Sequence, residues 1–224
     1  MAITTGSQKR QTSHDALETT QTSSFQGWLV LLLVFIAGAA SLCVEMAATR
    51  KMTPYVGDSL FVWASVIGLI LLYLTVGYYV GGILSDRYPR PIYLYYITAL
   101  ASLFIALIPL LADPVLRWVQ LTFANYELGV LYASLIAIVL LFAIPTILLG
   151  CVSPYAIRIR IQQIGSAGRT AGVLYAISTA GSILGTFLPV LVLLPYLGTN
   201  LTFLLSALVL LLLSVAGILT NRKA

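Results

Sequence analysis

The sequence predicts an all-α, polytopic membrane protein with six transmembrane helices. Of its 224 residues, 60% are hydrophobic and only 8% are charged, whereas soluble domains carry about 25% charged residues. So few charges cannot cover a water-facing surface, which excludes a soluble globular fold. The same apolar excess excludes disorder for most of the chain. The apolar residues also gather in stretches longer than the roughly 20 residues that a membrane-spanning helix requires.

Five charge-free stretches locate the spanning helices. They are residues 19–44, 59–85, 91–112, 128–157 and 170–221. The last stretch is long enough for two spans and is interrupted by the turn-forming sequence Pro195-Tyr-Leu-Gly-Thr-Asn200. We therefore expect six helices, near residues 26–49, 59–84, 91–111, 129–156, 171–194 and 199–219.

The remaining residues complete a three-part organisation. Residues 1–24 are rich in Ser, Thr and Gln and are expected to form a flexible polar tail in the cytoplasm. Residues 25–220 form the six-helix transmembrane domain, and residues 221–224 form a short basic cytoplasmic tail. Residues 113–123 begin with an Asp-Pro helix start and are predicted to form a short helix in the membrane interface, with an ordinary loop as the alternative.

Basic residues favour an orientation with both termini in the cytoplasm, because cytoplasmic loops carry the excess of Lys and Arg. Nine of the twelve basic residues then lie inside: Lys9, Arg10, Arg87, Arg90, Arg158, Arg160, Arg169, Arg222 and Lys223. The other three, Arg50, Lys51 and Arg117, lie outside. The net charge of +5 is then a topology signal and not a nucleic-acid footprint. We expect a multi-pass protein of the bacterial inner (cytoplasmic) membrane, with the lipid bilayer as its first partner.

Metal, cofactor and thiol chemistry are not predicted. Cys43 and Cys151 both lie inside apolar stretches, which disfavours a disulfide framework or a thiolate metal site. His14 is the only histidine and lies in the polar tail, which leaves no histidine for a zinc site or a catalytic triad. We therefore expect no cofactor, no metal and no catalytic residue.

Glu45 marks a candidate ligand site because it interrupts an apolar span. A carboxylate in hydrocarbon is costly and usually faces the helix bundle or a polar cavity. Together with Arg50, Asp58 and Trp63 it could form an acidic and aromatic pocket for a cation. The alternative is structural, with Glu45 paired to Arg50 and Asp58 capping the second helix.

The loop after the second helix resembles the loop motif of major facilitator transporters, Gly-x-Leu-x-Asp-Arg-x-Gly-Arg. The matching residues are Gly82, Leu84, Asp86, Arg87 and Arg90. Pro89 replaces the second glycine, and Pro91 replaces the second basic residue of the motif. The charged side chains are expected to pair with each other and with neighbouring helix ends, in what is a gating loop in that family. The alternative is a tight turn that only obeys the positive-inside rule.

Two further patterns concern docking and packing. The arginines of the cytoplasmic loops are expected to form a positively charged platform for an acidic partner or for anionic lipid heads, built from Arg87, Arg90, Arg158, Arg160 and Arg169. Small residues at four-residue spacing, which let helices approach closely, are expected to serve packing alone. These are Gly77 with Gly81 and Gly181 with Gly185.

Taken together, these features resemble the membrane domain of the bacterial spermidine-synthase-like proteins, over most of residues 38–205. Residues 168–199 carry the most specific spacing, from Gly168-Arg169-Thr-Ala-Gly172 to Leu194-Pro-Tyr-Leu-Gly-Thr199. Ser178 departs from the asparagine expected there. In that family a soluble aminopropyltransferase domain follows the membrane domain, whereas here only Asn221-Arg-Lys-Ala224 follow the sixth helix. The resemblance implies a polyamine-related setting and carries over no catalytic residue.

Three functions remain open at this point. The first is a non-catalytic membrane anchor or subunit that docks a separate soluble aminopropyltransferase-like enzyme or a larger membrane complex. The second is a transporter or translocation half for a polyamine-like or other small solute. Six helices with both termini inside resemble half of a major facilitator fold, so a homodimer would supply twelve. The third is a membrane enzyme, which we do not expect from this chain alone.

Overall fold

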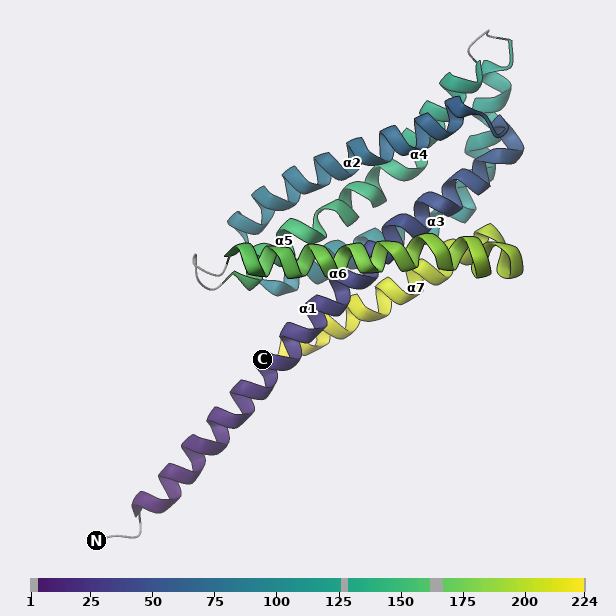
Figure 1. The fold of residues 1–224 in the computed structure, drawn as a ribbon. Coiled ribbons are helices and arrows are strands. Elements are labelled where there is room, and N and C mark those ends of the chain that lie inside the picture. Colours follow the sequence, from purple (N-terminus) through teal and green to yellow (C-terminus); the bar gives the residue numbers. More distant parts are fainter. Residues whose placement is uncertain (1–3, 126–128, 162–166, 224) are drawn as a thin grey trace.

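The computed structural model contains only helices among the residues it describes (Figure 1). It describes the backbone of residues 4–125, 129–161 and 167–223, and the side chains of these ranges from residue 26 to residue 222. In chain order the elements are α1 (Thr4–Val56), α2 (Leu60–Arg87), α3 (Pro91–Phe123), α4 (Gly129–Gly150), α5 (Val152–Arg160), α6 (Ala167–Leu188), the π-helix η2 (Pro189–Leu193) and α7 (Leu194–Lys223). The predicted all-α class is confirmed.

Five of the described stretches are long and apolar enough to cross a membrane. They are Gln26–Val56, Leu60–Arg87, Pro91–Phe123, Gly129–Arg160 and Ala167–Arg222. Many large apolar side chains on the outside of α2, α6 and α7 are exposed, as expected for helices that face lipid. The chain is therefore built as a multi-pass membrane protein.

The first two helices meet at a glycine turn. Gly57 has φ 79°, a left-handed conformation that favours glycine, and its N–H donates to the carbonyl of Thr53 at 2.9 Å. Ser59 then caps α2 by accepting a hydrogen bond from the Val62 N–H at 3.4 Å. Asp58, which the structural alternative placed at this position, is not the cap. At its other end α1 begins at Thr4, within the predicted flexible tail, whose flexibility and cytoplasmic location stay predictions.

Small residues bring α6 against α1, backbone to backbone. A Cβ added at Gly181 would lie 1.9 Å from the carbonyl oxygen of Phe35, and one added at Gly185 would lie 2.0 Å from that of Ala39. Because the residue numbers rise together along the two helices, α1 and α6 run parallel. The predicted packing role of the Gly181 and Gly185 pair is confirmed.

The second glycine pair joins α2 to α4 and the start of α5 in the same way. A Cβ added at Gly77 would lie 2.3 Å from the carbonyl oxygen of Ile147, and one at Gly81 would lie 2.6 Å from the Cα of Cys151. These helices also run parallel, since both residue numbers rise together. One glycine pair thus brings α6 against α1, and the other brings α2 against α4. The helices α3 and α7 complete the bundle.

Short polar side chains connect the helices inside the bundle. Each of three contacts joins two different helices, where a hydroxyl or thiol finds a partner across the interface. They are Ser65–Ser134 at 3.2 Å (α2–α4), Thr98–Ser214 at 2.7 Å (α3–α7) and Cys43–Ser206 at 3.0 Å (α1–α7). With these partners, polar groups inside the bundle avoid much of the cost of being buried unpaired.

The long apolar stretch Ala167–Arg222 reverses direction near its middle. The π-helix η2 follows α6, and Gly198 then interrupts the helical backbone with φ 79° and ψ 172°. Figure 1 shows the green α6 and the yellow α7 on either side of this reversal. The break predicted at residues 195–200 is confirmed, because only glycine readily adopts this backbone conformation.

The segment 113–123 is helical, as predicted, but it is not a separate interfacial helix. It continues α3 through Pro114. Leu116 and Val119 are fully buried, so this extension packs into the bundle and does not lie on its own at the membrane surface. A proline removes one helical hydrogen bond, and burial against neighbouring helices supports the helix through it.

Candidate functional site

The polar residues gather at two opposite ends of the bundle. We call the end where α2 meets α3, at residues 86–91, the loop end, and the end where α1 meets α2, at residues 50–58, the pocket end. Predicted site residues occur at both ends.

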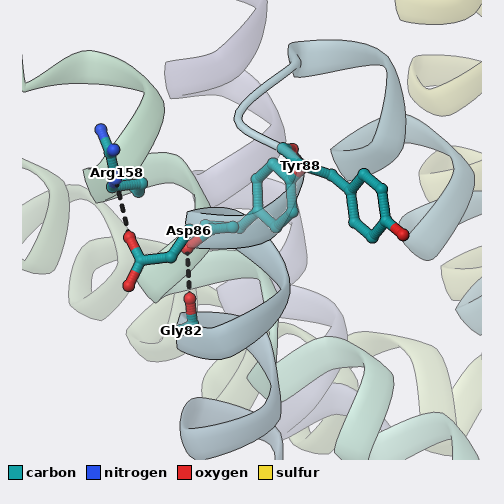
Figure 2. A network of polar contacts seen from close by, with 6 residues as sticks. Gly82, Asp86, Tyr88 and Arg158 are labelled. Carbon is teal, nitrogen blue, oxygen red and sulfur yellow. Dashed lines mark hydrogen bonds and ion pairs between the residues drawn. The ribbon is translucent and has the colours of Figure 1, made fainter.

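At the loop end, Asp86 pairs with Arg158. The Arg158 Nε donates to the Asp86 Oδ1 at 2.8 Å, which joins the end of α2 to α5 (Figure 2). The Asp86 side chain is 73% exposed and the Arg158 side chain 48% exposed. Water therefore screens the pair, and its contribution to stability is small. The motif's acidic residue therefore links neighbouring helices, as predicted, but its partner is Arg158 and not the motif's own Arg87 or Arg90.

A buried tyrosine of α5 also contacts the backbone of this loop. The Tyr155 hydroxyl of α5 lies within hydrogen-bonding distance of two carbonyl oxygens of the loop, those of Tyr88 and of Arg90, the latter at 3.2 Å. Tyr155 is fully buried, and Pro91 starts α3 directly after the loop. The turn between α2 and α3 is therefore fixed by α5, mainly by a contact that is removed from water.

The arginines of the predicted platform differ in the contacts that they form. Besides Arg158, Arg160 is engaged, because its Nη1 donates to the Gly27 carbonyl of α1 at 2.7 Å. Arg87 lies over the ring of Tyr88, with 5.7 Å from Cζ to the ring centroid. Arg87, Arg90 and Arg169 are exposed and form no ion pair among the described residues.

At the pocket end, a charged network joins three helices. The Lys51 Nζ of α1 lies 2.8 Å from the Asp113 Oδ1 of α3 and donates to the Asn200 Oδ1 of α7 at 3.0 Å. The Tyr55 hydroxyl donates to the same Asp113 oxygen at 2.8 Å. The Lys51 side chain is only 12% exposed, so this network is better shielded from water than the pair at the loop end.

This network borders a polar pocket of about 390 Å³. Its lining comes from the end of α1, from Asp113 and from the reversal around Gly198 near the start of α7, at residues 197–201. Arg50 lines the pocket as well, is exposed, and forms no ion pair or hydrogen bond within the described part of the chain. Lys51 and Arg50 together exceed the single carboxylate of Asp113, which leaves the pocket positively charged.

Of the four residues of the predicted cation site, Asp58 and Trp63 contact each other in the part of the chain that the structure describes, and Glu45 and Arg50 do not form an ion pair. Glu45 is half-buried in α1, seven residues after Gly38 and so on the same helix face, which packs against α6. No ion pair joins Glu45 to Arg50 among the described residues, because positions five apart point about 140° away from each other around a helix. Asp58 accepts a hydrogen bond from the Trp63 Nε1 at 2.7 Å, which is a contact within one exposed turn.

The polar pocket includes residues that sequence reasoning did not select, namely Tyr55, Asp113 and Asn200. A signal for two of them was present. Asp113 is the first charge after an apolar span, and Asn200 closes the predicted break between the last two spans. Both therefore lie at the same membrane border as Lys51. Their meeting required the helix order in space, which no spacing in the sequence encodes.

The described residues contain no group of three or more His, Cys, Asp or Glu side chains arranged to hold a metal ion. No family model matches the chain, and no curated protein or solved structure matches it either.

Proposed function

We propose that the chain crosses the membrane six times, with both termini in the cytoplasm. The stretch Ala167–Arg222 has 56 residues, about 84 Å as a straight helix, whereas a hydrocarbon core is about 30 Å thick. The reversal at Gly198 divides it into two lengths that each suffice for one crossing. The basic loop end then faces the cytoplasm, in keeping with the positive-inside rule.

We propose that this protein is a non-catalytic membrane anchor or subunit that docks a soluble partner at its loop end. The supporting observation is that α5 braces the α2–α3 turn through Tyr155 while Arg87 and Arg90 stay exposed beside it. A fixed surface with exposed cations suits an acidic partner, because the partner meets preorganised charge and loses little flexibility.

A capture experiment tests this function. The full chain is isolated in mild detergent, and the proteins that remain bound are identified and quantified at low and high salt. The double variant Arg87→Gln/Arg90→Gln should lose most of a specific partner at low salt. Arg117→Gln, which removes one exposed cation on α3 outside the loop end, is the control and should keep the partner. Partner capture that is equal in all variants and insensitive to salt would refute docking at the loop end.

The resemblance to spermidine-synthase-like membrane domains suggests which partner to test first. We propose a separate aminopropyltransferase-like protein, since in that family a soluble aminopropyltransferase domain accompanies the membrane domain. The purified chain with a diamine and an aminopropyl donor should give no turnover above a no-protein control. Turnover by the chain alone would contradict the non-catalytic function.

We propose as the alternative function a transporter half that works as a homodimer. The observation that favours it is the exposed Asp86–Arg158 pair, which joins two helices through a contact that can break at little cost. The motif that Asp86 belongs to is a gating loop in the major facilitator family. Uptake of labelled spermidine into vesicles that contain only this chain would favour the transporter. Absence of uptake together with salt-sensitive capture of a partner would favour the anchor.

A further inference from the structure

A second opening lies deeper in the membrane on the same two helices that border the polar pocket. It is an apolar groove of about 320 Å³ between α1, α6, η2 and α7. Its only polar side chains are Cys43 and Ser206, which contact each other at 3.0 Å. The groove therefore offers a ligand apolar surface without an unpaired polar side chain, which suits a hydrocarbon chain and not a polar solute.

The groove and the polar pocket follow one line along α1. Ala40 and Cys43 line the groove, and Arg50 and Pro54 line the pocket, at the three- and four-residue steps that keep side chains on one helix face. From Cys43 to Arg50 the helix rises about 10 Å at 1.5 Å per residue. This separation fits within one leaflet, which is about 20 Å thick including headgroups.

The facing helix α7 repeats this arrangement. Leu201 lines the polar pocket, and Leu205, one turn further, lines the groove. Their side chains are 48% and 36% exposed, so this face of α7 stays open between the two openings. The Lys51–Asn200 and Cys43–Ser206 contacts show that α1 and α7 run side by side in opposite directions here. The pocket and the groove therefore lie one after the other along the contact between α1 and α7, which we call the seam.

Charge selects the headgroup that the seam would accept. Lys51 is held by Asp113 and Asn200, whereas Arg50 has no anionic partner among the described residues. A guanidinium binds phosphate oxygens in a two-pronged geometry. We propose that the seam between α1 and α7 binds an anionic phospholipid, with its phosphate at Arg50 and one acyl chain in the groove. This proposal requires no docking partner and holds for either orientation in the membrane.

Lipid competition on the intact chain tests the proposal. The protein in detergent micelles is given phosphatidylglycerol and phosphatidylcholine with identical acyl chains, and bound lipid is counted by native mass spectrometry. The wild type should prefer phosphatidylglycerol, and Arg50→Gln should reduce that preference by about tenfold, the effect of one charge-assisted hydrogen bond. Arg169→Gln is the matched control, because it removes an exposed cation of α6 that does not line the pocket, and should keep the preference.

A second pair of variants tests the groove separately. Val209→Trp fills the groove and should lower binding of both lipids, whereas Leu208→Trp, on the neighbouring exposed position outside the groove, should not. Thermal unfolding without lipid confirms that each variant is folded. The proposal is overturned if Arg50→Gln keeps the preference, or if both tryptophan variants bind like the wild type. It is also overturned if glycerol 3-phosphate displaces the lipid at equal concentration, because the pocket would then be a site for free phosphate esters.

Discussion

At the loop end, we expect the buried Tyr155 to contribute more to the free energy of unfolding than the exposed Asp86 of the loop motif. Tyr155→Phe removes the hydroxyl that contacts two loop carbonyls inside the protein and should cost about 1–3 kcal/mol of unfolding free energy. Asp86→Asn breaks only a solvent-exposed pair and should cost about 0.2–1 kcal/mol. Reversible unfolding of both variants in mixed micelles measures the two losses. A larger loss for Asp86→Asn would show that the ion pair, not the tyrosine, fixes the turn.

A substitution at Glu45 distinguishes a ligand-binding role of this carboxylate from a structural pairing with Arg50. Since Glu45 forms no ion pair with Arg50, Glu45→Gln should leave thermal stability unchanged or raise it, because a neutral amide costs less than a carboxylate within a span. If a polyamine binds at Glu45, the same variant should weaken spermidine affinity by about ten- to a hundredfold. A fall in stability that Arg50→Gln then restores would instead support the structural pairing.

The residue scale also shows where sequence reasoning stops. It selected Asp86 through the loop motif and Arg50 through its place five residues after Glu45, because charges beside apolar runs stand out. It did not single out Tyr155, because a tyrosine near a helix end carries no such signal. It did not single out Asn200 either, whose one signal was its place at the end of the predicted break between the last two spans. Their roles depend on which helices are neighbours, and that order is a property of tertiary packing.

At the scale of helices, the glycine contacts predict a sharp positional contrast within α6. Gly185→Ala would place a Cβ 2.0 Å from the Ala39 carbonyl oxygen, so the two helices must separate, at a cost of about 1–3 kcal/mol. Gly172→Ala meets nothing within 4 Å and should stabilise the helix by about 0.5–1 kcal/mol. Unfolding of the two alanine variants in the same micelles measures this difference in sign. Equal effects at both positions would contradict the close α1–α6 contact.

Helix positions were predictable because membrane spans have a strong compositional signal. The predicted spans 59–84 and 129–156 agree with the α2 span Leu60–Arg87 and the α4–α5 span Gly129–Arg160. The predicted end of the first span at residue 49 was too early, because the helix continues through Arg50 and Lys51 to Val56. Charges ended the predicted span, but a helix at the membrane border can continue into the headgroup region.

For the whole molecule, both proposals depend on the helix bundle lying across a bilayer, and docking also depends on its orientation. The five apolar stretches establish the multi-pass class. The number of crossings follows only if Ala167–Arg222 spans twice, and the orientation follows only from the distribution of basic residues. An even number of crossings puts both termini on one side, whereas five crossings would separate them.

Cysteine accessibility in intact cells tests this directly. Ser7→Cys, Asn125→Cys and Ala224→Cys are made one at a time, with the native Cys43 and Cys151 retained because both are buried. A membrane-impermeant maleimide should label position 125 in intact cells, and positions 7 and 224 only after the membrane is permeabilised. Labelling of positions 7 and 224 from opposite sides would contradict six crossings, and labelling of position 125 only from the cytoplasm would contradict the proposed orientation.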